Sequence, residues 1–203
     1  MIQKNYLNNL YTEEKWLANL RASHLDFPIA KKETTRFLTT ILAMKQPKKV
    51  LEIGTCIGFS TMLMAKYIED IHITTIERHK MMIDKAKFHF DQYNVAHKIE
   101  LIEENALYAL ENMDNTYDLI FLDAAKGQYI NFLPHILRLL NMGGTLISDN
   151  LLQLAGKDYN TIEKRMRTIY NNMQQFIEAI TTTPQLETTI LPIGDGIGLS
   201  VRV

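Results

Sequence analysis

Three polar residues at the ends of two apolar segments have the types expected of a metal site. Asp123 follows Phe121-Leu122, and Asp149 and Asn150 follow Ile147-Ser148. If the two segments are neighbouring parallel strands, their carboxyl ends share one edge of a sheet and these side chains converge. Oxygen ligands without cysteine or histidine favour Mg²⁺, with Mn²⁺ and Ca²⁺ as alternatives. Each residue alone is equally well explained by an Asx turn or a helix cap.

Lys126, three residues after Asp123, is a candidate base. A nearby cation repels the ammonium form of a lysine and so favours the neutral amine. A neutral amine can take a proton from a substrate hydroxyl. The expected chemistry is deprotonation of a hydroxyl group beside a metal ion, with Lys126 and Asp123 as the catalytic residues.

A loop with two glycines is a candidate cofactor site. Gly54 and Gly58 follow the apolar run Val50 to Ile53 and precede a helix that Ser60 or Thr61 could cap. Their spacing differs from the G-x-G-x-x-G of dinucleotide-binding folds, and no Walker lysine follows the second glycine. A nucleoside cofactor without phosphates therefore fits better, although both glycines could be ordinary turn residues.

Two acidic residues flank this loop. Glu77 ends the run from Thr74, about 20 residues beyond the loop, where a carboxylate can accept hydrogen bonds from both ribose hydroxyls. Glu52 precedes Gly54 closely enough to meet the ammonium group of a cofactor. Glu77 alone could be a solvated strand end. Together, the loop and the two carboxylates favour S-adenosylmethionine, and its sulfonium methyl group would be attacked by the deprotonated hydroxyl oxygen.

The elements that must position these residues alternate along the chain, as in a doubly wound α/β sheet. We expect parallel strands at residues 50–53, 71–76, 99–102, 118–122 and 145–148. We expect helices between them, including residues 60–68, 81–93 and 129–140. The resulting fold class is α/β and Rossmann-like, with a mostly parallel sheet of seven strands.

The two ends of the chain depart from this alternation. Residues 1–47 have helical spacing, interrupted at Asp26-Phe27-Pro28, and could form a lid or an interface. Near the C-terminus we expect a helix at about residues 162–180 and two β-like runs, 188–193 and 198–203. The Asp195-Gly196 turn between these runs makes them antiparallel, so the sheet ends in a reversed hairpin strand.

Composition limits the class of protein. The 203 residues are 46% hydrophobic and 22% charged, which suits one domain spanning residues 1–203. The lone Cys56 excludes an internal disulfide and a thiolate zinc cage. No signal-like or membrane-spanning pattern is present, so we expect a cytoplasmic protein without a membrane partner. Cys56 as a nucleophile is disfavoured because no histidine motif accompanies it.

Several separated motifs resemble the metal-dependent class I S-adenosylmethionine O-methyltransferases related to catechol and caffeoyl-CoA methyltransferases. They are Leu51 to Thr55, Phe121 to Lys126, Ser148 to Asn150 and Pro192 to Gly196. The resemblance implies that Asp123, Asp149 and Asn150 bind magnesium and that Lys126 is the base. It also implies that adenosylmethionine contacts Glu52, Gly54, Ser60, Glu77, Ala106 and Asp123.

Within that family, Asp123 to Tyr129 followed by Asn131-Phe132 is similar to the bacterial tRNA 5-hydroxyuridine methyltransferases. This resemblance implies methylation of the wobble uridine in a tRNA anticodon loop, giving 5-methoxyuridine, and family members are commonly homodimers. Basic residues that could contact phosphates are Lys31, Lys32, Lys45, Lys48, Lys49, Lys157, Lys164, Arg165 and Arg167.

Other functions stay open at this stage. The basic residues could simply be solvated helix faces in a chain of net charge −1, and the acceptor would then be a small catechol-like or caffeoyl-CoA-like phenol. A non-catalytic nucleotide-binding module is a remote alternative, since fold alone does not establish activity. A nicotinamide oxidoreductase is disfavoured by the glycine spacing.

Overall fold

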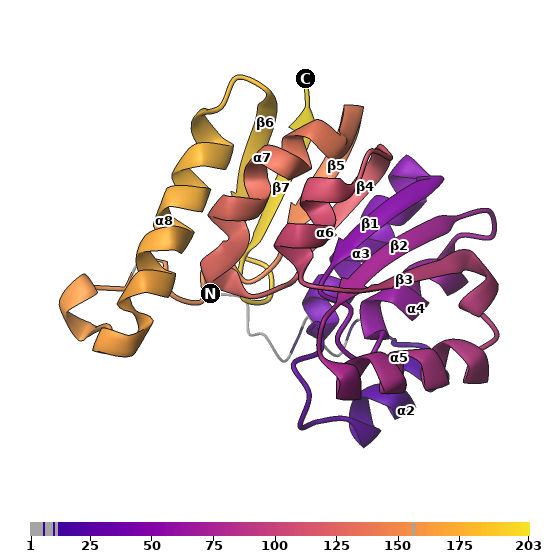
Figure 1. The fold of residues 1–203 in the computed structure, drawn as a ribbon. Coiled ribbons are helices and arrows are strands. Elements are labelled where there is room, and N and C mark those ends of the chain that lie inside the picture. Colours follow the sequence, from indigo (N-terminus) through magenta and orange to yellow (C-terminus); the bar gives the residue numbers. More distant parts are fainter. Residues whose placement is uncertain (1–5, 7–9, 11, 156) are drawn as a thin grey trace.

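The computed structural model describes residue 6, residue 10 and residues 12–155 and 157–203. Its centre is a seven-stranded sheet of order β3-β2-β1-β4-β5-β7-β6, with helices on both faces (Figure 1). The strands are β1 (Lys49–Ile53), β2 (His72–Glu77), β3 (Ile99–Glu103), β4 (Tyr117–Leu122), β5 (Leu140–Ser148), β6 (Leu186–Leu191) and β7 (Ile197–Arg202). The predicted Rossmann-like α/β fold is confirmed.

Helices connect the strands in the predicted order. The α-helices are α2 (Lys15–Ser23), α3 (Lys32–Lys45), α4 (Phe59–Tyr67), α5 (Lys80–Gln92), α6 (Ala106–Asn112), α7 (Tyr129–Leu139) and α8 (Arg167–Thr182). Short 3₁₀ turns are η1 (Ala96–Lys98), η2 (Lys126–Gln128), η3 (Tyr159–Thr161) and η4 (Lys164–Met166). Among the described residues, no helix has the length and apolar character needed to cross a membrane.

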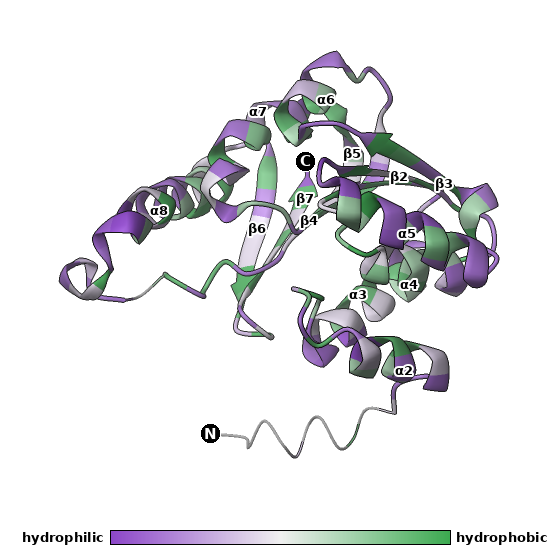
Figure 2. Cartoon of the chain, turned by 60° about the horizontal axis from the view of Figure 1, so that its bottom comes forward, coloured by the Kyte–Doolittle hydropathy of each residue, from purple (hydrophilic) through white to green (hydrophobic). Residues whose placement is uncertain are grey.

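Two hydrophobic cores cover the two faces of the sheet, because successive strand residues point to opposite sides. Val50 belongs to the core formed with α2 to α5, whereas its neighbour Leu51 belongs to the core formed with α6, α7 and α8. Figure 2 shows the hydrophobic residues following the central strands, with hydrophilic residues gathered on the outer surfaces of the helices. Both faces of the central strands are therefore buried.

The C-terminal hairpin reverses one strand inside the sheet and not at its edge. β7 is antiparallel to both β5 and β6, so it lies between them and β6 forms the edge. The two strands are joined by residues 192–196, a longer loop than the tight Asp195-Gly196 turn that we expected. The reversed strand itself is as predicted.

Two predicted boundaries are wrong. The last helix begins at Arg167, not near residue 162, because Asp158 accepts the backbone N–H of Asn160 at 2.9 Å and starts the short turn η3, which η4 follows after Glu163. β5 begins at Leu140, not at Thr145, and contains Gly143 with φ +72 where its pairing with β4 is irregular. The glycine pair Gly143-Gly144 conceals this strand in the sequence.

The N-terminal region contains α2 and α3, and the chain between them is irregular around Asp26 to Pro28, as predicted. Leu17 and Leu20 of α2 are buried in the first core. The helical prediction for residues 1–5, 7–9 and 11 lies outside the described residues. Whether the region acts as a lid or a homodimer interface stays a prediction.

Candidate active site

The cavity opens where the strand order reverses. From β1 the chain proceeds outward to β2 and β3 and then crosses to β4 on the other side of β1. Gly54 follows β1 with φ +106, and a Cβ there would overlap the backbone oxygen of Asp123 at the end of β4. Only glycine permits this close approach. The candidate cofactor loop and metal ligand thus meet at one switch point, where ligands bind in open α/β sheets.

Glu52 lies beneath the cavity. Its side chain is fully buried and accepts hydrogen bonds from Ser60 Oγ at 2.5 Å, from Thr75 Oγ1 at 2.6 Å and from the Thr61 hydroxyl. Burial raises the pKa of Glu52 to about 7, although the three hydroxyls oppose the shift. Ser60 lines the cavity and Glu52 does not. The predicted direct contact of Glu52 with a cofactor ammonium group therefore does not fit this geometry.

The start of α4 also differs from expectation. Neither Ser60 nor Thr61 caps the helix, because Gly58 is the N-cap residue, with φ +82, and both hydroxyls are directed to Glu52. A Cβ at Gly58 would overlap the Phe90 ring of α5. Glycine is therefore required at this position for two reasons: the positive φ of the turn and the close packing of the loop on α5.

Glu77 lies on the cavity wall, as predicted, and its carboxylate is already oriented by the backbone. Its Oε2 accepts the Cys56 N–H at 3.0 Å, and its Oε1 accepts the N–H groups of Arg78 and His79, both at 2.9 Å. The bond to Cys56 holds the loop at a residue with φ +50, a conformation unusual for a side chain other than glycine or asparagine. One carboxylate thereby fixes the shape of the cofactor loop.

Ala106 is the first residue of α6 and lines the same cavity. Asn105 is the N-cap residue of this helix, and its side-chain oxygen accepts the Leu107 N–H at 3.0 Å. Cys56, in the loop between β1 and α4, lies against Met82 of α5, with 3.9 Å between the two sulfur atoms. Burial raises the pKa of the Cys56 thiol to about 11, which opposes a nucleophilic role.

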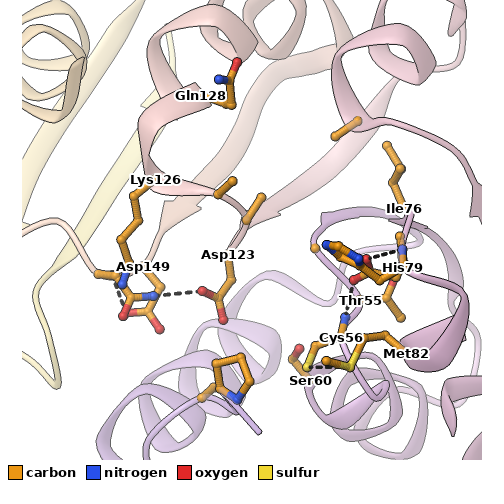
Figure 3. A pocket seen from close by; sticks show the side chains of 18 of the residues that line it. Thr55, Cys56, Ser60, Ile76, His79, Met82, Asp123, Lys126, Gln128 and Asp149 are labelled. Carbon is orange, nitrogen blue, oxygen red and sulfur yellow. Dashed lines mark hydrogen bonds between the residues drawn. The ribbon is translucent and has the colours of Figure 1, made fainter. Parts of the chain in front are cut away.

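The three candidate metal ligands converge. Asp149 N donates to Leu122 O at 3.0 Å, which joins the ends of β4 and β5. Asn150, with φ 68, donates from its side chain to Asp123 Oδ1 at 2.8 Å and from its backbone to Asp149 Oδ1 at 2.7 Å. Figure 3 shows Asp123, Asp149 and Lys126 on one side of the pocket.

The raised pKa values of this cluster favour a positive charge beside its carboxylates. Burial raises the pKa of Asp123 well above its usual range, and the Asp149 carboxylate raises it further. Burial also raises the pKa of Asp149. The described residues contain no group of three His, Cys, Asp or Glu side chains arranged for a metal. The candidate ligand set is thus two carboxylates and one amide, whose oxygen faces the cluster if the Asn150 side chain turns over.

Lys126 lines the cavity beside these carboxylates and lowers the pKa of both. Its Nζ donates to Oε1 of Gln153, a residue from the loop after β5. The structure thus brings together Asp123, Lys126, Asp149 and Asn150, as the sequence predicts.

The cavity has a volume of about 860 Å³ and is closed on one side by the N-terminal region. Residues 28–31 and Thr34 of α3 line it there, and Lys31 Nζ contacts Asp195 Oδ1 of the β6–β7 loop at 2.5 Å. The buried Thr34 hydroxyl lies near the Asp149 carboxyl and helps to lower its pKa, against the larger effect of burial. This wall lies near the candidate metal ligand Asp149, whose pKa both Thr34 and Asp195 affect.

Comparison with known proteins decides the family. The model of the O-methyltransferase family matches residues 7–203. The chain belongs to the O-methyltransferase family. Caffeoyl-CoA O-methyltransferase of Citrus natsudaidai is 32% identical over 180 residues, which cover 83% of this chain and 77% of that protein.

Solved structures give the same fold. A Staphylococcus aureus protein, provisionally named a caffeoyl-CoA O-methyltransferase, has a TM-score of 0.89 and 32% identity over 100% of both chains. The Bacillus cereus O-methyltransferase in complex with SAH has a TM-score of 0.82 at 21% identity, covering 98% of this chain and 96% of that one. The predicted class of enzyme, an adenosylmethionine-dependent O-methyltransferase, is confirmed.

Sequence reasoning missed part of the O-methyltransferase cavity. Thr55, His79 and Met82 line the half opposite Asp123 and Asp149 (Figure 3). His79 and Met82 follow Glu77 closely enough to have been expected near the cofactor loop. Nothing in the sequence indicates that Thr34 or Gln153 faces the cavity, because their positions depend on how distant segments pack.

Proposed function

We propose that this O-methyltransferase transfers the methyl group of S-adenosylmethionine to a hydroxyl of a small phenol, with the help of a divalent cation, Mg²⁺ by default. The observation that supports this most strongly is the convergence of Asp123, Asp149 and Asn150 beside the Gly54 loop in one cavity. Two carboxylates whose pKa values are raised, the half-buried Asp123 and the buried Asp149, suit a hard cation with an amide next to them.

The residues have distinct roles in this proposal. Gly54, Ser60, Glu77 and Ala106 line the half that would hold the cofactor, with the Glu77 carboxylate accepting ribose hydroxyls. Asp123 lies between both halves and adjoins the Gly54 backbone. Glu52 acts indirectly, because it fixes the hydroxyl of Ser60. A bound Mg²⁺ lowers the pKa of an acceptor hydroxyl, which then needs only a modest base.

Lys126 is that base. Its amine lies in the cavity next to the Asp123 and Asp149 cluster and can accept the acceptor's proton at Nζ. The cofactor supplies the sulfonium methyl group, and the chain's task is to hold donor and acceptor in line.

A small phenol is favoured over the tRNA substrate that we expected from the Asp123 to Tyr129 motif. The Citrus natsudaidai relative named above is a caffeoyl-CoA O-methyltransferase, and the names of the relatives reported above do not refer to tRNA. Several of the basic residues that could contact phosphates also have acidic partners: Lys31 pairs with Asp195, Lys48 with Asp70, and Arg165 with Glu163. These pairs reduce the positive charge available to a nucleic acid.

The test is methyl transfer from labelled S-adenosylmethionine, with Mg²⁺ and with chelator, to catechol, caffeoyl-CoA and tRNA bearing 5-hydroxyuridine. We expect label in a phenol, lost with chelator. Label in the tRNA alone would replace the small acceptor by an RNA. Equal labelling of a phenol with and without chelator would remove the cation from the proposal.

A further inference from the structure

Lys126 is held by a residue from a different loop. Lys126 belongs to η2, which follows β4, whereas Gln153 belongs to the loop that follows β5. Both side chains line the cavity, and the Gln153 amide oxygen accepts a hydrogen bond from Lys126 Nζ. This contact links the loops that follow two neighbouring strands, directly above the candidate metal ligands.

The backbone that carries Lys126 is fixed independently of this contact. Asn172 of α8 donates from its side chain to Gly127 O at 2.7 Å, and Gln128 N donates to Ala125 O at 2.8 Å. A Cβ at Gly127 would lie 3.4 Å from the side chain of Ile169, so η2 packs directly on α8. The turn is therefore anchored at its base, while the long lysine side chain depends on contacts at its tip.

The backbone that carries Gln153 is fixed from the opposite side. Leu151 N donates to Gly196 O at 2.9 Å, and Leu152 N donates to Asp195 O at 2.8 Å. Gly196 has φ +94, and a Cβ there would overlap Leu152. The β6–β7 loop thus places Gln153, and the amide at its tip reaches across the cavity mouth to Lys126.

The charges around the amine explain why a neutral partner matters. Asp123 and Asp149 attract it from below, and the Lys31–Asp195 pair lies across the cavity. Without another acceptor, a flexible lysine would settle on the carboxylates that the cation needs. An amide oxygen holds the amine away from them and adds no negative charge that would stabilise its protonated form.

We propose that Gln153 is the positioning residue for Lys126, holding its amine at the acceptor side of the cavity, where it can accept the proton of the acceptor hydroxyl. The inference rests on the proposed function, in which Lys126 is the base. In this proposal Gln153 contacts Lys126 and not the acceptor or the cofactor. It acts through the direction and proton affinity of the lysine.

The kinetic test compares Gln153→Ala and Gln153→Glu with Gln128→Ala, a matched control. Gln128 lines the same cavity, but its amide oxygen accepts from Asn131 Nδ2 at 2.9 Å and not from Lys126. We expect Gln153→Ala to lower kcat about 10-fold or more with the KM for adenosylmethionine unchanged. Gln153→Glu should move the acid-side midpoint of the rate to higher pH, because a carboxylate stabilises the protonated amine. Gln128→Ala should leave that midpoint in place.

A second readout needs no acceptor. Acetic anhydride acetylates neutral amines, so the labelling rate of Lys126, followed by peptide mass spectrometry over a pH series, reports its proton affinity. We expect slower labelling of Lys126 at a given pH in Gln153→Glu and an unchanged rate in Gln128→Ala. Superimposable labelling curves for wild type and Gln153→Glu would overturn the proposal.

The two readouts separate this inference from the proposed function. If Lys126→Ala retains turnover, the base assignment fails, whatever Gln153 does to labelling, and the positioning role falls with it. If Lys126→Ala is inactive while Gln153→Ala keeps a wild-type kcat and pH profile, the positioning role alone is overturned.

Discussion

On the β1–β2 side of the cavity, Glu52 and Glu77 each accept three hydrogen bonds from the chain itself, whereas on the β4–β5 side Asp123 and Asp149 face one another. The first pair is satisfied by hydroxyls and backbone N–H groups. In the second pair, Asp149 accepts the backbone N–H of Asn150 and Asp123 accepts its side-chain amide, and the two carboxylates repel. All four carboxylates lie in or directly after strands of the sheet, yet the chain gives more hydrogen-bond donors to the first pair than to the second.

This difference suggests that the two ligands bind in different ways. The cofactor half is formed in advance, because Glu77 fixes the loop through Cys56 and Glu52 fixes Ser60. In the proposed function, the acceptor half would be completed when a cation neutralises the Asp123 and Asp149 carboxylates, since charges removed from water require pairing or coordination. Substitutions in one half should therefore affect binding of that half's ligand and leave binding in the other half unchanged.

The largest effects should come from the β4–β5 side. We expect Lys126→Ala and Asp149→Ala each to abolish turnover, because general base catalysis alone contributes about 10²–10⁴-fold. Only Asp149→Ala should markedly weaken Mg²⁺ binding in calorimetry, since Lys126 is not a ligand. Near-normal turnover of the Lys126→Ala enzyme would contradict the assignment of Lys126 as the base. Equal loss of metal affinity in both variants would contradict the assignment of Asp149, but not Lys126, as a metal ligand.

Glu52 should make stability depend on pH. Its pKa is raised from 4.5 to about 7 in the folded state, so the native protein binds this proton more tightly than the unfolded chain. Stability from this group is fully present below pH 4.5 and is lost as pH rises toward 7, by at most about 3 kcal/mol. Glu52→Gln, neutral at every pH, should flatten that decline.

Denaturant unfolding at pH values from about 5 to 8 measures this effect. Saturating Mg²⁺ should be present throughout, so that the titration of Asp123 and Asp149 contributes little. Parallel curves for wild type and Glu52→Gln would show that Glu52 stays ionised in the native protein, and its place in the preformed half would have to be reconsidered.

Glu77 should matter for cofactor affinity. We expect Glu77→Ala to weaken the binding free energy of S-adenosylhomocysteine by about 1.5–3 kcal/mol through loss of a charge-assisted hydrogen bond. The Kd should therefore rise roughly 10- to 150-fold. Glu77→Gln keeps one acceptor for the loop and should lose less. Calorimetry without added metal is the measurement, and an unchanged Kd in Glu77→Ala would displace Glu77 from the ribose site.

The smallest effect should be at the wall formed by the N-terminal region. The Lys31–Asp195 pair is partly exposed, with side chains 48% and 25% accessible, so Lys31→Ala should cost less than about 1 kcal/mol of stability. Salt should reduce the difference from wild type. A loss of several kcal/mol in thermal unfolding would mean that this pair holds α3 and the β6–β7 loop together far more strongly than a surface ion pair does.

Most of the fold could be predicted because apolar strands and amphipathic helices alternate with little ambiguity. β5 was expected five residues too late because Gly143 and Gly144 interrupt its apolar pattern. The start of α8 was misplaced because Asp158 begins a turn that helical periodicity does not reveal. In both cases a local backbone effect overrode the pattern of side chains.

The candidate site was predictable where residues directly follow strands, as Asp123, Asp149 and Asn150 do. Glu52 was misjudged because it lies inside β1, where alternation directs its side chain toward α4 and not into the loop. The wall containing Lys31 and Asp195 could not be predicted, since these residues are 164 positions apart in the chain. Contacts of that range depend on tertiary packing, which no local pattern encodes.

The most direct test of the central claim is calorimetric titration of Mg²⁺ into the metal-free protein near pH 7, in two buffers of different ionisation enthalpy. Because the pKa values of Asp123 and Asp149 are raised without a cation, binding should release protons, and the measured heat should differ between the buffers. We expect saturable binding at one site, with proton release, lost in Asp149→Ala. Absence of saturable binding, or binding that Asp149→Ala leaves unchanged, would contradict the account.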